Sequence, residues 1–235
     1  MIKSRITKAE CLVGSVVLLA LTTAATPNIF SAMANARKAR TINNAKMLGI
    51  ALVEFESQYG GLPCEDTKEM LIDEGAKFPK GTSSNHYFSQ LIVSRILDTE
   101  RIFFVEKMAR TKKADDVFNT PETVLSQGEN GFAYVMKDKT EGFSMTDNAR
   151  IPLAAAPLSK GGKLPTFQRK LFHGEGVALR LDCSVGTFKI DEKGQLISKK
   201  TGKNVFLTGE GTIWGNSAPT VREPWLPEEE KKEAK

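Results

Sequence analysis

The segment CLVGSVVLLALTTAATPNIFSAMANA occupies residues 11–36 and carries no charged side chain. A hydrocarbon core about 30 Å thick needs roughly 20 apolar residues in a helix that rises about 1.5 Å per residue. This segment is therefore long enough to span a bilayer. It predicts the transmembrane half of a helix over residues 9–36, preceded by a short basic segment at residues 1–8 that is similar to a leader.

The helical pattern continues beyond the apolar segment. Residues 37–60 mix charged and apolar side chains, and apolar residues recur at helical spacing from Ile42 to Leu52. Gly60 and Pro63 then predict a stop, because glycine accepts the positive φ of a helix end and proline cannot continue the helix. We expect one rod on the order of 75 Å long. A rod of that length with one apolar end must pack on something outside its own domain.

The composition is that of a globular domain with an attached anchor. The chain has 235 residues, of which 40% are hydrophobic and 26% are charged, with a net charge of +5. No basic patch alternates with aromatic residues, so nucleic acid is not an expected partner. Residues 61–226 are enough for one domain with its own core. The tail, residues 227–235, is almost entirely charged, and we expect it to be disordered.

Short periodic runs in the domain predict its fold class. Residues 64–75 and 84–97 are typical of short helices. Residues 101–105 could form a strand or a turn, and residues 109–130 are typical of a surface loop. Strand-like runs bounded by turn residues occupy residues 131–136, 151–156, 177–181 and 185–190. In the third run Val177, Leu179 and Leu181 alternate with Ala178 and Arg180, which predicts a half-buried antiparallel strand. The prediction is an α+β fold with a long N-terminal helix packed on a C-terminal antiparallel sheet.

Two patches resemble the type IV pilin and type II secretion pseudopilin family. Ile6 takes the place of the first mature residue, Glu10 follows four positions later, and Pro27 lies seventeen positions beyond Glu10. Near the C-terminus, His173 is followed nine positions later by Asp182-Cys183-Ser184-Val185, which is similar to the Asp-Gly-Ser-Val of many such proteins. Together the patches cover about the first quarter of the chain and one short C-terminal segment.

The resemblance implies a pilin-like fold and a structural subunit without enzymatic activity or a cofactor. It implies a single-pass protein of the cell inner membrane with a cytoplasmic N-terminus and a periplasmic domain; basic residues on both sides of the apolar segment leave the orientation undecided by charge. The implied partners are membrane lipid, an inner-membrane assembly platform, the prepilin peptidase, and other pilin-like subunits in a homo- or hetero-oligomeric filament of a type II secretion system or a type IV pilus.

Four N-terminal residues have implied roles. An ionised Glu10 beside hydrocarbon is costly and therefore a functional candidate; in the family this glutamate attracts the N-terminal amine of a neighbouring subunit. The alternative places Glu10 in the headgroup zone beside Lys8. Pro27 removes a helical hydrogen bond and predicts a kink. Arg5 and Ile6 form the processing junction, and Arg5 replaces the glycine that the peptidase expects.

Three other functional interpretations remain open. Arg5 and Lys8 favour a membrane-anchored periplasmic adaptor or binding module that does not polymerise. A basic start followed by an apolar core also fits a cleaved signal peptide. An anchored enzyme would need a polar cleft around His173 and Asp182.

The cysteines predict a disulfide if the domain is periplasmic. Cys11 lies in the apolar segment, which leaves Cys64 and Cys183 in the domain. Thiols in an oxidising compartment are rarely left unpaired, and Cys183 stands where relatives often have glycine. We expect a Cys64–Cys183 bond; two unrelated buried thiols are the alternative.

The remaining polar candidates are expected to be structural. His173 is expected to hydrogen-bond a loop, and Asp182 to accept backbone N–H groups in a hairpin turn. Asp115, Asp116 and Asp138 could ligate calcium, which some pseudopilins bind, but they lack an oxygen-rich repeat spacing. We expect them to be solvated acids, and the sequence predicts no metal site.

Overall fold

A computed structural model describes the backbone of residues 8–228 and the side chains of residues 29–228. The helices are α1 Lys8–Tyr59, α2 Glu65–Asp73 and α3 Ser84–Val93, with short 3₁₀ turns η1 Arg101–Phe103 and η2 Pro121–Thr123. The strands are β1 Ala133–Met136, β2 Pro152–Ala156, β3 Leu158–Lys160, β4 Thr166–Phe167, β5 Glu175–Arg180, β6 Val185–Ile190, β7 Leu196–Ile197 and β8 Thr220–Arg222. The predicted α+β class is confirmed.

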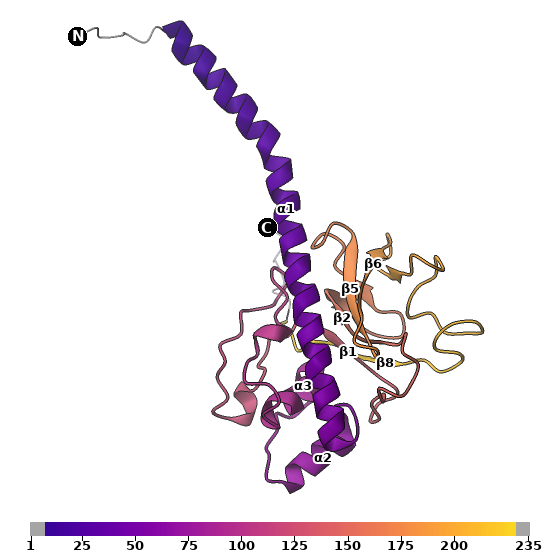
Figure 1. Ribbon diagram of the computed structural model, residues 1–235. Coiled ribbons are helices and arrows are strands. Elements are labelled where there is room, and N and C mark those ends of the chain that lie inside the picture. Colours follow the sequence, from indigo (N-terminus) through magenta and orange to yellow (C-terminus); the bar gives the residue numbers. More distant parts are fainter. Residues whose placement is uncertain (1–7, 229–235) are drawn as a thin grey trace.

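Helix α1 is the longest element, and the domain packs on both sides of its C-terminal half (Figure 1). Its 52 residues run without interruption, a length of about 78 Å at 1.5 Å per residue. The domain surrounds the C-terminal half of the helix, while the N-terminal half extends away from it (Figure 1). The helix ends where expected: Gly60 has a φ of 75° and its N–H donates to the carbonyl of Glu56 at 2.8 Å.

Six strands form one antiparallel sheet beside α1. Their order is β7-β6-β5-β2-β1-β8, and a separate two-stranded sheet pairs β3 with β4. The four runs predicted as strands became β1, β2, β5 and β6. Strand β8 closes the edge beside β1, with Val221 opposite Val135. The sequence around β8 has no strand periodicity, and this pairing was not predicted.

Helix α1 contacts the sheet at a glycine. A methyl group built on Gly49 would lie 2.9 Å from Cδ1 of Leu179 on β5, so the absence of a side chain lets the helix approach the strand closely. The other face of β5 is also covered, because Ala178 is as fully buried as Leu179. The predicted antiparallel strand is confirmed as β5, but the prediction that it is half-buried is wrong, because residues 176–179 are all buried. The long segment that follows β7 also contributes buried aromatic side chains, Phe206 and Trp214, which stack 6.1 Å apart.

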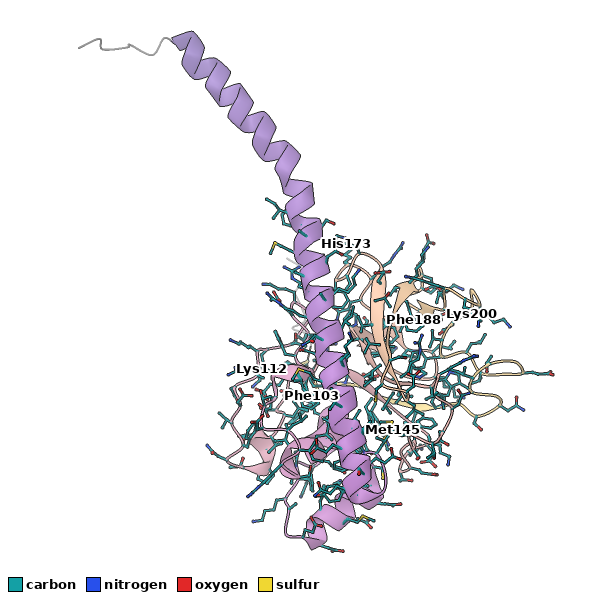
Figure 2. The ribbon with its side chains drawn as sticks, viewed as in Figure 1. Phe103, Lys112, Met145, His173, Phe188 and Lys200 are labelled. Carbon is teal, nitrogen blue, oxygen red and sulfur yellow. The ribbon has the colours of Figure 1, made fainter. Side chains whose placement is uncertain are left out.

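The helical layer completes the domain. Phe103 and Lys112 lie on one side of α1 and Phe188 and Lys200 on the other (Figure 2). Both short helices are confirmed, and α3 ends earlier than predicted because Arg95 adopts a φ of 62°. The open choice at residues 101–105 resolves as the 3₁₀ turn η1. The predicted surface loop at residues 109–130 is only partly correct, since Leu125, Glu129 and Asn130 are buried in its second half.

Candidate functional site

Apolar side chains remain exposed on α1 along its outer side. Where the helix leaves the domain, Phe30 is 68% exposed and Ile29 and Met33 are also open to solvent. Further along, Met47, Ile50 and Val53 are exposed while Leu48 and Leu52, between them in sequence, are fully buried. Helical periodicity explains the division, because positions three apart share one face. The outer face, defined here as Ile29, Met33, Met47, Ile50 and Val53, remains exposed among residues 29–228. Phe30 lies about five full turns before buried Leu48 and so on the same side of the helix; it is exposed because it lies where the helix has left the domain (Figure 1).

Ion pairs hold α1 where it enters the domain. Lys38 Nζ lies 2.7 Å from Oε2 of Glu175 at the start of β5, and this contact is the main reason that the pKa of Glu175 is lowered. On the other side, Arg40 lies 2.6 Å and Arg37 3.6 Å from the carboxylate of Glu106. The helix is thus tied to the sheet and to the loop layer at the same level.

The N-terminal assembly residues lie at or beyond the limit of the described region. Glu10 and Pro27 fall within α1, which continues through both positions, but their side chains lie outside the described residues. Arg5 and Ile6 lie outside the described residues altogether, as does most of the charged tail predicted from residue 227. Across residues 29–228, no helical segment is long and apolar enough to cross a membrane; most of the predicted span, residues 9–36, precedes that range.

The predicted Cys64–Cys183 disulfide is not formed, and both residues are free thiols. Cys183 lies against Gly49, ten residues before the end of α1, whereas Cys64 follows the end of that helix. The contact at Gly49 is therefore about 15 Å from the end of the helix. A disulfide requires Cα atoms within about 7 Å, whereas the two thiols have separate surroundings: Cys183 lies against Gly49, and Cys64 is the N-cap of α2.

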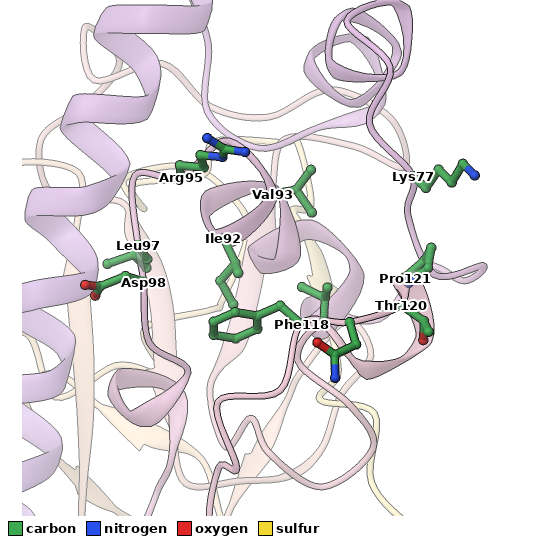
Figure 3. Close-up of a pocket in the computed structure, with 11 residues that line it drawn as sticks. Lys77, Ile92, Val93, Arg95, Leu97, Asp98, Phe118, Thr120 and Pro121 are labelled. Carbon is green, nitrogen blue, oxygen red and sulfur yellow. The ribbon is translucent and has the colours of Figure 1, made fainter.

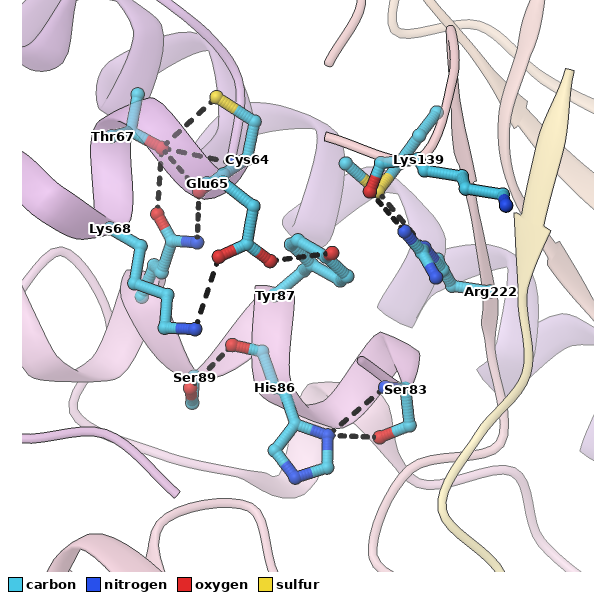
Figure 4. A network of polar contacts seen from close by, with 12 residues as sticks. Cys64, Glu65, Thr67, Lys68, Ser83, His86, Tyr87, Ser89, Lys139 and Arg222 are labelled. Atoms are coloured by element: carbon cyan, nitrogen blue, oxygen red, sulfur yellow. Dashed lines mark hydrogen bonds and ion pairs between the residues drawn. The ribbon is translucent and has the colours of Figure 1, made fainter. Parts of the chain in front are cut away.

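A buried polar network accounts for Cys64 instead (Figure 4). Its N–H donates to Oγ1 of Thr67 at 2.9 Å, and its carbonyl accepts from Nε2 of Gln90 at 2.9 Å. Thr67 in turn donates to Oε1 of Gln90 at 2.7 Å. These bonds fasten the start of α2 to α3, so Cys64 is a capping residue here and its position is set by backbone groups.

A second part of the network surrounds the first turn of α3. The ring of His86 is buried, and its Nδ1 accepts from the N–H of Ser83 at 3.1 Å. Its Nε2 has no hydrogen-bond partner among the described residues. The ring stacks on Trp225 with centroids 5.4 Å apart. Burial lowers the pKa of His86. Sequence reasoning did not assign a role to this histidine.

Of the two turn residues predicted near the C-terminus, Asp182 makes the expected hydrogen bond and His173 does not. Asp182 lies in the turn between β5 and β6, where its Oδ1 accepts from the N–H of Ser184 at 2.9 Å. His173 is exposed with a φ of 53°, and its ring makes no hydrogen bond to any described residue. The expected bond from His173 to a loop is therefore not formed. Cys183 occupies the turn with a φ of 61°, the conformation that favours glycine.

An open pocket of about 570 Å³ lies beyond the end of α3 (Figure 3). Ile92, Phe118 and Val124 supply apolar lining, and the charged groups are Lys77, Arg95 and Asp98. The lining contains no histidine, cysteine or serine. The pocket could accommodate a small apolar group, but its lining has few side chains that could transfer a proton.

The three predicted calcium candidates are not brought together. Asp138 accepts the N–H groups of Thr140 and Glu141, both at 2.8 Å, in an exposed turn. Asp116 pairs with Arg101 at 2.8 Å. Asp115 lies instead beside Glu100 and Glu129, a grouping that could not be found from sequence spacing because the three acids are far apart in the chain.

No family model, no curated protein and no solved structure matches this chain. Its function is therefore inferred from its own residues.

Proposed function

We propose that this chain is a pilin-like or pseudopilin-like structural subunit. It is anchored in the inner membrane and assembles through α1 into a filament of the type II secretion or type IV pilus kind. The observation that carries the proposal is that α1 extends far beyond the domain that it organises (Figure 1). Apolar side chains such as Phe30 are exposed where the helix leaves the domain.

Burial of the exposed apolar surface of α1 would provide the driving force for assembly. Apolar area removed from water contributes about 25 cal/mol per Å², and a large exposed apolar surface on a soluble domain marks an interaction site or a membrane contact. The uncharged segment at residues 11–36 suits lipid, and the outer face of α1 suits neighbouring helices. Packing of α1 helices from successive subunits would bury both.

The ion pairs at the domain entrance suit a mechanical role. Lys38 with Glu175, and Arg37 and Arg40 with Glu106, hold the helix to two layers of the domain. A pull along α1 is thereby passed to the sheet and to the loop layer together. In this proposal the work is structural, no chemical step is catalysed, and the partners are other pilin-like subunits, the assembly platform and the prepilin peptidase.

Cysteine crosslinking in membranes tests the proposal. Single cysteines are introduced at Met33 and Met47 on the outer face, with Lys193→Cys in the exposed β6–β7 turn as a matched control. Because the native cysteines stay in every variant, the parent chain gives the background. A ladder of crosslinked oligomers is expected from Met33→Cys and Met47→Cys, and none from Lys193→Cys or the parent. Monomers alone in all four samples would contradict assembly and favour the anchored adaptor.

A further inference from the structure

Three carboxylates converge in the segment between α3 and β1. Glu100 precedes η1, Asp115 lies in the following loop, and Glu129 precedes β1. One oxygen from each lies within 4.8 Å of the others. The cluster is separate from the outer face of α1 and from the polar network around Cys64.

Two of the three carboxylates are completely buried, each with one oxygen that lacks a hydrogen bond. Glu100 is 0% exposed; its Oε1 accepts from the N–H of Leu125, while its Oε2 has no partner. Glu129 is also 0% exposed; its Oε2 accepts from the N–H and Oγ of Ser126 at 2.7 and 2.9 Å, while its Oε1 has no hydrogen bond. Buried polar atoms are normally satisfied, and an unpaired buried carboxylate oxygen is costly.

The protein supplies too little positive charge for these groups. Lys112 Nζ lies 3.4 Å from Oε1 of Glu129, but its side chain is 52% exposed. Arg101 is engaged with Asp116. When all three acids are ionised, Lys112 balances one charge and leaves two negative charges. Burial, followed by the charges of Glu129 and Asp115, raises the pKa of Glu100 to about 7.

We propose that Glu100, Asp115 and Glu129 form a binding site for a divalent cation, and that the preferred ion is Ca²⁺. The ligands are all oxygens, which suits a hard cation. Three protein carboxylates in one site suit calcium, which takes six to eight oxygens in flexible geometry. Magnesium demands near-ideal octahedral geometry, keeps several waters and usually binds only one or two carboxylates. The ion also provides the two positive charges that the cluster lacks.

Neighbouring groups place the ligands and leave a route from solvent. Asp116 accepts the backbone N–H of Glu100 at 2.8 Å and the hydroxyl of Thr99 at 2.9 Å, so it holds the backbone of Glu100 and does not belong to the ligand set. Asp115 is exposed, which gives the ion access from water, and water completes the coordination. Glu106, which pairs with α1, lies in the same segment, so the ion would also stiffen the loop layer that holds the helix.

Calcium titration of the full chain in detergent tests the site. After removal of divalent ions with a chelator, CaCl₂ is added while thermal unfolding and binding heat are measured. The expected result is a rise in Tm of several degrees at millimolar Ca²⁺ and a smaller rise with MgCl₂. Asp115→Asn, which changes an exposed side chain, should weaken binding at least tenfold, and Glu100→Gln should abolish it. Glu122→Gln removes an exposed carboxylate of the same segment outside the cluster and should bind as the parent does.

Limited trypsin digestion gives a local readout. Calcium should slow cleavage after Lys112 and Lys113, both exposed in the loop, and leave cleavage after exposed Lys139 unchanged. A parent chain that shows neither binding heat nor a Tm shift in millimolar Ca²⁺ would overturn the proposal and would mean that a proton on Glu100 relieves the cluster. An equal Tm shift in the parent, Asp115→Asn and Glu100→Gln would overturn it too, since calcium would then bind elsewhere.

Discussion

The thiol of Cys183 donates a hydrogen bond to the carbonyl oxygen of Gly49 at 3.6 Å. The tight turn between β5 and β6 thus touches the C-terminal part of α1 at Gly49, where the helix has no side chain to keep it away. The helix and the sheet, which are 134 positions apart at this contact, are joined here at a partly buried site.

Gly49→Leu tests this close approach. A Cβ at this position already lies 2.9 Å from Leu179 and 3.5 Å from Cys183, so a larger side chain forces the turn away from the helix. Overpacking of this kind costs about 2 kcal/mol of unfolding free energy. Lys46→Leu adds the same residue at an exposed position of α1 and should change stability by about 0.5 kcal/mol or less. Equal urea midpoints for the two variants would show that the contact tolerates bulk.

The two cysteines of the domain should be found as free thiols. A disulfide closing a loop of about 120 residues would contribute roughly 4 kcal/mol, so Cys183→Ser should cost far less than that, about 1 kcal/mol. Alkylation of the folded protein should modify half-buried Cys183 before buried Cys64. Alkylation of Cys183 should itself be slow, because burial raises the pKa of its thiol and so lowers the fraction of reactive thiolate. Peptide mapping of the exported protein without reductant decides the matter; a Cys64–Cys183 crosslinked peptide would contradict the fold around α1.

Much of the fold could be predicted from local sequence patterns, whereas the groups of buried residues that are distant in sequence could not. The stop at Gly60 and the strands β5 and β6 are encoded in short stretches whose backbone preferences agree with the final structure. Burial of Ala178 on β5 was not predictable, because the alternating pattern of residues 177–181 indicates which side chains share a face but not whether both faces are covered. The same limit applies to the grouping of Glu100 with Asp115 and Glu129, since no spacing rule connects residues that only the folded chain brings together.

The disulfide prediction failed for a related reason. The prediction paired Cys64 with Cys183 because the domain was expected to lie in an oxidising compartment and contains only these two cysteines. Neither fact says where each residue lies in the fold. The hydrogen bonds of Cys64 to Thr67 and Gln90 fasten it to α2 and α3, whereas Cys183 bonds to Gly49 of α1. The sequence could show that the two cysteines are in one domain, but not that each lies against different elements of it.

Glu10→Ala should leave the protein in the membrane and abolish filament formation. If the proposed function holds, the substitution removes a charge without reducing hydrophobicity, so the anchor remains, but the attraction for the N-terminus of a neighbouring subunit is lost. Glu69→Ala, which removes an exposed carboxylate on α2, is the control and should assemble normally. Sheared fractions and electron microscopy report the outcome; normal filaments from Glu10→Ala would count against the assembly mechanism.

Arg5→Gly should increase processing. In the proposed pilin-like subunit, Arg5 places a bulky cation where the prepilin peptidase expects a small residue, so much of the native protein is expected to keep residues 1–5. N-terminal sequencing of purified membranes should find mainly Met1 in the parent and mainly Ile6 in Arg5→Gly. Complete trimming at Ile6 in the parent would show that arginine is accepted at this position.

Stability should fall in mild acid because of His86. The unperturbed pKa of histidine is about 6.5, and burial holds the pKa of His86 in the folded chain below that value. The charge of Lys68 lowers it further, while the Lys80 backbone hydrogen bond and the charge of Glu65 oppose the shift. The unfolded chain therefore binds a proton more readily than the folded chain. The contribution of His86 is fully present above about pH 6.5 and is lost as the pH falls through the folded pKa.

The hydrogen bond at the start of α3 gives the structural reason. Nδ1 accepts from the N–H of Ser83, so a proton on Nδ1 would break this bond and leave a charge stacked on Trp225 in a buried site. His86→Gln keeps an acceptor but cannot titrate. Urea unfolding at several values between pH 7.5 and 5 should show the advantage of the parent over His86→Gln shrinking on acidification. His173→Gln changes the exposed histidine and should keep the pH dependence of the parent. A constant difference between the parent and His86→Gln across that range would show that His86 does not titrate during unfolding.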